Sequence, residues 1–190
     1  MNIEHHIKNH VISVSNFVTP EWCENRIAQS ESMGFETAKL TTINGQVEDL
    51  SIRNNRRLFF KDKILAQDLF EKITPSLPSP FRGREAVRLN EMFRIYRYDI
   101  GQQFDWHQDG YYQSPDYLRS RFTLMIYLNA DFTGGGTTFS DWDNNPEFSD
   151  FTITPETGKA LLFYHPIVHR GDPVQSGRKY VLRTDVMYMW

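Results

Sequence analysis

The chain has little of what marks secreted, membrane-spanning or nucleic-acid-binding proteins. Its 190 residues include one cysteine, Cys23, which excludes an intrachain disulfide. Lys and Arg number 21 against 24 Asp and Glu, so there is no basic excess to attract nucleic acid. No apolar run reaches the roughly 18 residues of a membrane span, and the polar amino terminus lacks the apolar core of a signal peptide. We therefore expect a cytoplasmic protein that binds neither membranes nor nucleic acid.

Internal repeats and low-complexity tracts are also missing. An apolar fraction of 39% with 14% aromatic residues is typical of an ordered globular protein, and the length suits one domain. Residues 74–83 contain three prolines and predict a loop, which is the one candidate internal boundary. We expect a single domain, 1–190, with a helical support over about 1–85 and a catalytic β core over about 86–190.

Two helices are predicted before this loop. Thr19 followed by Pro20 is a typical helix start, and Gly34 is a typical end. A second helix is predicted over 62–73, because apolar residues recur there every four positions and a proline follows. A short strand is predicted over 11–18.

Strands dominate the second half of the chain. The segments rich in branched and aromatic residues, or alternating in polarity, are 87–98, 122–129, 151–153, 160–164 and 179–188. Two helices followed by many short strands favour an α+β fold that is mainly β. A double-sheet jelly roll with N-terminal supporting helices is the architecture that fits best.

A metal site is predicted from three residues. His107 and Asp109 are two positions apart, so on an extended segment their side chains share one face. His169 ends an apolar run sixty residues after Asp109 and supplies a third ligand. Two imidazoles and one carboxylate on one side of a metal leave the other positions open, which is the facial triad of non-haem iron(II) oxygenases.

Other interpretations compete with this one. An H-x-D pair alone is a weak signal, because such pairs occur by chance on surfaces and in cores. Zinc accepts the same ligands. His165, four residues before His169, is an alternative third ligand. The surrounding sequence has to decide among these possibilities.

The last predicted strand carries two cations, Lys179 and Arg183, on one face. Both could be solvated, which is the usual state of charged side chains. A loop with turn residues joins this strand to His169, and a hairpin there would return Lys179 to the metal. Arg183 lies on the same face as Lys179 and is the competing residue for contact with a metal-bound acid. Arginine would bind such an acid through two parallel hydrogen bonds, whereas lysine would act as a point charge.

Five stretches, in order along the chain, carry a resemblance to a known family. They are Tyr98-x-x-Gly-x-x-Phe-x-x-His107-x-Asp109, Thr123-x-x-x-Tyr127-Leu-Asn129, Gly134-Gly-x-Thr-x-Phe139, Pro155-x-x-Gly-x-Ala-Leu-Leu-Phe163 and His169-x-Gly-x-Pro-Val-x-x-Gly-x-Lys179. On these motifs, which span a little under half of the chain, the sequence resembles the iron(II)/2-oxoglutarate dioxygenases related to prolyl 4-hydroxylases. The resemblance implies a double-stranded β-helix fold.

The resemblance also implies a reaction. An enzyme of this kind uses Fe(II), 2-oxoglutarate and O2, with ascorbate in support, to hydroxylate an unactivated C–H bond, and it releases succinate and CO2. Tyr98 and Lys179 would hold the distal carboxylate of 2-oxoglutarate, with Tyr127 assisting and Arg183 as a second anchor. The alternatives are a non-catalytic metal-binding or ligand-sensing β domain that uses the same pocket, and a cupin-type dioxygenase without cosubstrate. A bare structural metal would need neither Tyr98 nor Lys179, and the cupin-type enzyme would also lack that cation.

The sequence departs from the family pattern on its last strand. Relatives with prolyl hydroxylase activity often carry a tryptophan there, whereas this chain has Arg183-Thr-Asp185-Val-Met187. A prolyl side chain, a free amino acid and a small metabolite therefore stay open, so the partner is a small-molecule or a peptide or protein substrate. The residues expected to contact it are Arg94, Tyr111, Tyr112 and Asn55. The sequence carries no signal for an oligomeric state.

Overall fold

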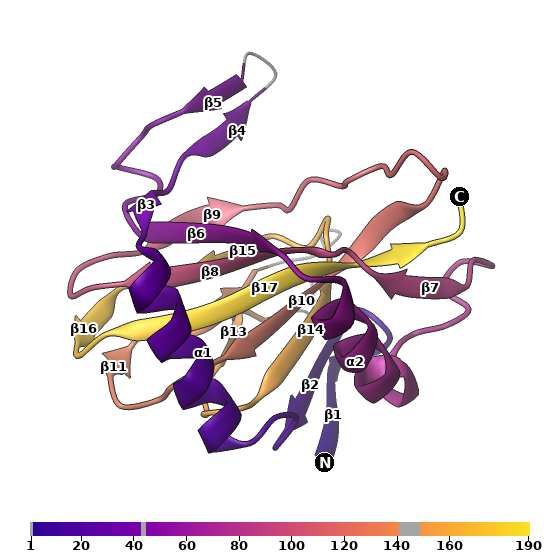
Figure 1. Cartoon of the computed structure of the whole chain (residues 1–190), viewed down its shortest axis with the longest axis horizontal. Helices are drawn as coiled ribbons and strands as arrows, with labels where there is room; N and C mark the ends of the chain where they lie inside the picture. Colours follow the sequence, from indigo (N-terminus) through magenta and orange to yellow (C-terminus); the bar gives the residue numbers. More distant parts are fainter. Residues whose placement is uncertain (1, 43–44, 141–148) are drawn as a thin grey trace.

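The computed structural model describes residues 2–42, 45–140 and 149–190. A large antiparallel sheet forms the body of this part (Figure 1). Its strands, in spatial order, are β1 (Asn2–Ile7), β2 (Val11–Ser15), β14 (Ala160–Tyr164), β10 (Arg119–Tyr127), β17 (Lys179–Tyr188), β8 (Met92–Tyr98), β6 (Arg56–Lys61) and β3 (Glu36–Thr37), and β7 (Ala86–Leu89) pairs with the end of β17.

Strands from the second half of the chain form a second, smaller sheet. It contains β13 (Phe151–Ile153), β12 (Thr137–Phe139), β15 (His169–Gly171) and β9 (Phe104–His107). Two-stranded ladders join β11 (Thr133–Gly134) to β16 (Val174–Ser176) and β4 (Leu40–Thr42) to β5 (Gly45–Val47). From β8 onward the chain alternates between the two main sheets, which is how a double-stranded β-helix is wound. The predicted mainly β fold is therefore confirmed.

Two helices and a short 3₁₀ turn support the large sheet. Helix α1 (Pro20–Met33) begins where Thr19 Oγ1 accepts a hydrogen bond from the Trp22 N–H, and α2 (Lys63–Ile73) begins where Asp62 Oδ1 accepts one from the Leu65 N–H. The 3₁₀ turn η1 (Thr74–Ser76) follows α2. Both predicted helices are thus confirmed. None of the helices in the described ranges has the length and apolar character to span a bilayer.

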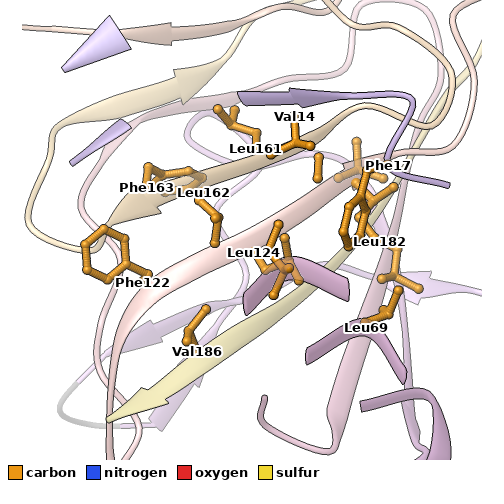
Figure 2. Packing of buried hydrophobic residues seen from close by; sticks show 14 of the residues in the cluster. Val14, Phe17, Leu69, Phe122, Leu124, Leu161, Leu162, Phe163, Leu182 and Val186 are labelled. Atoms are coloured by element: carbon orange, nitrogen blue, oxygen red, sulfur yellow. The ribbon is translucent and has the colours of Figure 1, made fainter. Parts of the chain in front are cut away.

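The core lies between these helices and one face of the large sheet. Leu124 of β10 and Leu182 of β17 are fully buried, and Figure 2 shows them near Leu69 of α2. Because strand side chains alternate, the neighbouring residues Thr123 and Arg183 point to the other face, toward the small sheet. The helices therefore fill one side of β10 and β17 and leave the other side for a site.

The amino-terminal region also contributes strands that the sequence did not predict. β1 pairs with β2 and so extends the large sheet at one edge, while β6 pairs with β8 and extends it at the other. The predicted strand over 87–98 is divided by a turn in which Asn90 Oδ1 accepts a hydrogen bond from the Met92 N–H. The division lets β7 pair with the end of β17 while β8 pairs with its beginning.

Candidate metal centre

His107, Asp109 and His169 converge between the two sheets. His107 ends β9, His169 begins β15, and the two residues are register partners in these paired strands. Asp109 follows β9, and its backbone N–H donates to the carbonyl of His165 at 3.0 Å. One ligand atom from each of the three side chains lies within 4.8 Å of the others. The structure therefore brings the three predicted ligands within reach of one ion.

Backbone carbonyls orient both imidazole rings. Nδ1 of His107 lies 2.7 Å from the carbonyl oxygen of Asp105, and Nδ1 of His169 lies 2.9 Å from that of Ile167. A carbonyl can only accept, so each Nδ1 carries the proton and each Nε2 keeps a free lone pair, 3.8 Å from a carboxylate oxygen of Asp109. Burial lowers the pKa of His107 to about 3 and also lowers that of His169. Both rings are therefore neutral, as metal binding requires.

Two donors orient the carboxylate of Asp109. Thr123 Oγ1 donates to Oδ2 at 2.6 Å, and Nη2 of Arg183 lies 3.0 Å from the same oxygen. Burial alone would raise the pKa of Asp109, but the guanidinium of Arg183 holds this pKa well below its usual range. Since both donors engage Oδ2, Oδ1 is left for a metal.

These donors fit a divalent transition metal with open positions. Two neutral imidazole nitrogens and one carboxylate oxygen form the ligand set of non-haem iron(II) sites. Phe104 stacks on His107 with ring centroids 3.5 Å apart, and the ring of Phe163 lies 4.5 Å from that of His169. These apolar contacts hold the imidazoles in place and exclude water from their outer faces.

A cavity of about 40 Å³ opens beside the three residues. Lys179 and Tyr98, register partners in β17 and β8, both line it. Nζ of Lys179 lies 5.0 Å from the centre of the Tyr98 ring and donates to the carbonyl of Gly135 at 2.6 Å. Lys179 is 2% exposed, and no carboxylate in the described part of the chain forms an ion pair with it. Burial lowers the pKa of Lys179 to about 8 and raises that of Tyr98 to about 12.

Arg183 lines the same cavity but has different partners. Besides Asp109, its Nη2 lies 3.6 Å from Oδ1 of Asp185, whose Oδ2 lies 3.4 Å from Nη1 of Arg94. Arg183 and Lys179 are four residues apart on one strand, which places them roughly 13 Å apart along it. Carboxylates therefore balance the charge of Arg183. In the described part of the chain, Lys179 has a neutral carbonyl as its hydrogen-bond partner, and Asp172 acts on it without forming an ion pair.

The other residues predicted at the site are placed less directly. The Tyr127 hydroxyl is 2.7 Å from Thr137 Oγ1, and its ring centre is 5.6 Å from Nζ of Lys179. Tyr111 and Tyr112 follow the metal ligands and are 58% and 44% exposed. Asn55 is fully buried, and its side chain accepts from Arg53 Nε and donates to a backbone carbonyl, so the structure does not bring it to the cavity.

Two residues beside the cavity, Thr123 and Arg53, have no predicted role as ligands of the metal or of 2-oxoglutarate. Thr123 shares the parity of Tyr127 on β10, so the alternation of that strand could have found it. Arg53 is 6% exposed and its guanidinium lies 4.6 Å from the ring centre of Tyr96 and 4.2 Å from that of Phe104. It begins the stretch Arg53-Asn54-Asn55-Arg56, which from sequence could be either a solvated turn or part of the substrate entrance.

Comparison with known proteins gives this geometry a context. The family model described as "2OG-Fe(II) oxygenase superfamily" matches residues 93–184. The chain is 29% identical over 191 residues to the "Putative prolyl 4-hydroxylase" of Acanthamoeba polyphaga mimivirus, covering 88% of this chain and 70% of that protein. It is 24% identical over 193 residues to "Prolyl 4-hydroxylase 2" of Arabidopsis thaliana, covering 86% and 62%. These matches support the predicted likeness to the 2OG-Fe(II) oxygenases related to prolyl 4-hydroxylases.

Solved structures of prolyl hydroxylases have the same fold as this chain. The viral collagen prolyl hydroxylase of Paramecium Bursaria Chlorella virus-1, solved with 2OG, gives a TM-score of 0.62 at 20% identity over 95% of this chain and 97% of that one. The prolyl hydroxylase of Trichoplax adhaerens, solved with a peptide of the hypoxia inducible factor oxygen degradation domain, gives 0.73 at 16% identity, over 94% and 83%. The predicted double-stranded β-helix and the predicted class, a prolyl-hydroxylase-like 2-oxoglutarate-dependent dioxygenase, are confirmed.

Proposed function

We propose that the chain is an Fe(II)- and 2-oxoglutarate-dependent hydroxylase that oxidises an unactivated C–H bond of a polypeptide side chain and releases succinate and CO2. One observation carries the proposal. The three convergent ligands share a narrow cavity with Lys179, a buried ammonium that forms no ion pair with a carboxylate among the described residues. A bare structural metal site would need the ligands but would have no use for this buried charge, which is costly to maintain without an anion.

Lys179, and not Arg183, is the proposed anchor for the distal carboxylate of 2-oxoglutarate. The guanidinium of Arg183 is already bound to Asp109 and lies close to Asp185, so its part is to hold the metal ligand. The Tyr98 hydroxyl stays protonated because burial raises its pKa to about 12, so it can donate to the same carboxylate. Tyr127 assists indirectly, because its hydroxyl already forms a hydrogen bond with Thr137.

The metal and the surrounding side chains would have separate tasks. Iron(II), held by His107, Asp109 and His169, would supply the activation of dioxygen and the oxidative decarboxylation of 2-oxoglutarate. The chain's own residues bind and orient. Thr123 and Arg183 fix the carboxylate through Oδ2, and the backbone carbonyls fix the imidazoles. This preorganisation keeps the reacting groups in register.

A polypeptide substrate is supported by two observations. Relatives of this chain bear the name prolyl 4-hydroxylase, and one similar structure was solved with a peptide. The last strand has the ion-paired Arg183 and Asp185 where prolyl hydroxylases often carry tryptophan, so the proposal names a polypeptide side chain without restricting it to proline.

Succinate release tests this proposal. Purified protein with Fe(II), ascorbate and 2-oxoglutarate should produce succinate slowly even without substrate, and His107→Ala and Asp109→Ala should abolish it. His5→Ala is a matched control, because His5 is an exposed histidine on β1. Retention of the parent rate in Asp109→Ala would overturn the ligand assignment. A parent protein that binds iron without releasing succinate would favour the sensing domain.

A further inference from the structure

A group of arginine and aromatic side chains lies beside the candidate metal centre, and we call it the arginine patch. Its members are Arg82, Arg84, Arg119, Arg121, Tyr111 and Trp190. They come from the loop before β7, the beginning of β10, the segment after Asp109 and the second residue after β17. Figure 1 shows the beginning of β10, β7 and the end of β17 meeting at one end of the molecule. Segments far apart in the sequence therefore concentrate positive charge in one place.

Ion pairs do not balance the positive charge of the patch in the part of the chain that the structure describes. None of its four arginines forms an ion pair with a carboxylate in the described ranges. The nearest acids along the chain have other partners, since Asp116 pairs with Arg88 and Glu85 accepts a hydrogen bond from the Ser79 hydroxyl. Burial lowers the pKa of Arg121, and the nearby arginines lower it further. In a chain whose formal net charge is −3, such a cluster is a surface for a negatively charged partner.

Aromatic rings hold part of the patch in a fixed geometry. The guanidinium carbon of Arg119 lies 3.4 Å from the centre of the Tyr111 ring and 4.4 Å from that of Trp190, which is also 5.8 Å from Arg121. Arg121 Nε is buried and has no hydrogen-bond partner. An arginine stacked on rings keeps the edge that carries its N–H groups free, and that edge matches a carboxylate through two parallel bonds.

The patch lies close to the proposed reaction site. Arg121 is two residues from Thr123, whose hydroxyl donates to Asp109, and Tyr111 is two residues beyond Asp109. Two residues of extended chain span roughly 7 Å. A polypeptide whose side chain enters the cavity would therefore pass over the patch within a few residues of the reacting position.

We propose that the arginine patch binds an acidic stretch of the polypeptide substrate, through Asp or Glu carboxylates a few residues from the side chain that is hydroxylated. This inference rests on the proposed function, in which the substrate is a polypeptide. Nucleic acid fits less well, because the patch holds four cations in an acidic protein and adjoins the narrow cavity. The patch thus selects among polypeptides by charge, while the cavity selects by shape.

Fluorescence anisotropy with the full chain tests the inference. The probes are labelled ten-residue Gly/Ser peptides that carry four Glu, four Gln or four Lys, together with a labelled ten-nucleotide oligothymidine. The Glu peptide should bind at least tenfold more tightly than the Gln peptide, and added salt should weaken this binding. Arg82→Glu/Arg84→Glu should weaken it at least tenfold, whereas Lys39→Glu/Lys63→Glu, which makes the same charge change at exposed sites elsewhere, should not.

Three results would overturn the inference. These are equal binding of the Glu and Gln peptides, an unchanged affinity in the Arg82→Glu/Arg84→Glu variant, and tighter binding of the oligothymidine than of the Glu peptide. The assay contains neither iron nor 2-oxoglutarate, so its result is separate from the succinate test. Succinate release without acidic preference would remove this inference alone. Acidic preference without succinate release would remove the proposed function and leave an acidic-peptide surface.

Discussion

Replacing Lys179 by methionine should stabilise the protein and at the same time weaken its use of 2-oxoglutarate. The Lys179 side chain is buried and bonds only the Gly135 carbonyl, and its pKa falls from the usual 10.5 to about 8. That difference corresponds to roughly 3 kcal/mol of cost to the charged form below pH 8. Methionine has a similar length, and it leaves one carbonyl without a donor at a cost of about 1–2 kcal/mol. The expected net gain is about 1–2 kcal/mol, or roughly 4 °C in melting temperature.

The opposite effect is expected on the cosubstrate. Loss of a charged hydrogen bond to the distal carboxylate should cost about 2–3 kcal/mol, which raises the Michaelis constant for 2-oxoglutarate roughly 30- to 150-fold. Urea denaturation and succinate production measure the two effects separately. Lys159→Met is the control, because Lys159 is also buried but pairs with Glu156, so its loss should bring no stabilisation and no change in the Michaelis constant. A destabilised Lys179→Met variant with a normal Michaelis constant would refute the anchor assignment.

Three further predictions concern pH, the metal ligand and the fold. Because the pKa of Lys179 is about 8, the Michaelis constant for 2-oxoglutarate should rise as the pH increases through 8 and the ammonium is deprotonated; steady-state succinate assays should show this rise in the parent and not in Lys179→Arg. Thr123→Val removes a hydrogen bond to the metal ligand and should weaken Fe(II) binding about 10-fold or more in anaerobic titrations, and unchanged binding would contradict that role. Gly158→Ala should destabilise the protein by roughly 2–4 kcal/mol in urea denaturation, because Gly158 has φ +78 and a Cβ there would lie 2.2 Å from the Val18 carbonyl oxygen. Gly83→Ala is the control: Gly83 has φ +74 but open space around it, so this change should cost only about 1 kcal/mol.

Much of the fold could be predicted because its signals are local. The cap residues Thr19 and Asp62 start the two helices, and the alternation along β10 and β17 separates a core face from a cavity face. β1 could not be found this way, because it is an edge strand whose first four residues are exposed on both faces, so no period of two marks it. β6 is framed by arginine and lysine, which are depleted in strands, and its pairing with β8 depends on the rest of the sheet.

The candidate site was predictable in kind and not in detail. Parity places Lys179 and Arg183 on the same face of β17, and the sequence offers no means of choosing between them. The choice depends on tertiary contacts, because the segment after β9 places Asp109 in contact with both Thr123 and Arg183. Asn55 shows the converse, since a polar residue in a turn-like stretch is buried by hydrogen bonds with its own neighbours. Such contacts leave no trace in spacing or periodicity.

The central claim is that three side chains hold iron beside a site for 2-oxoglutarate, and anaerobic calorimetry of the full chain tests it most directly. Fe(II) should bind with a stoichiometry of one, and 2-oxoglutarate should bind much more tightly after iron than before it. Asp109→Ala should lose the iron and, with it, the tight binding of 2-oxoglutarate. Equal affinity for 2-oxoglutarate with and without iron, or parent-like iron binding by Asp109→Ala, would contradict the claim.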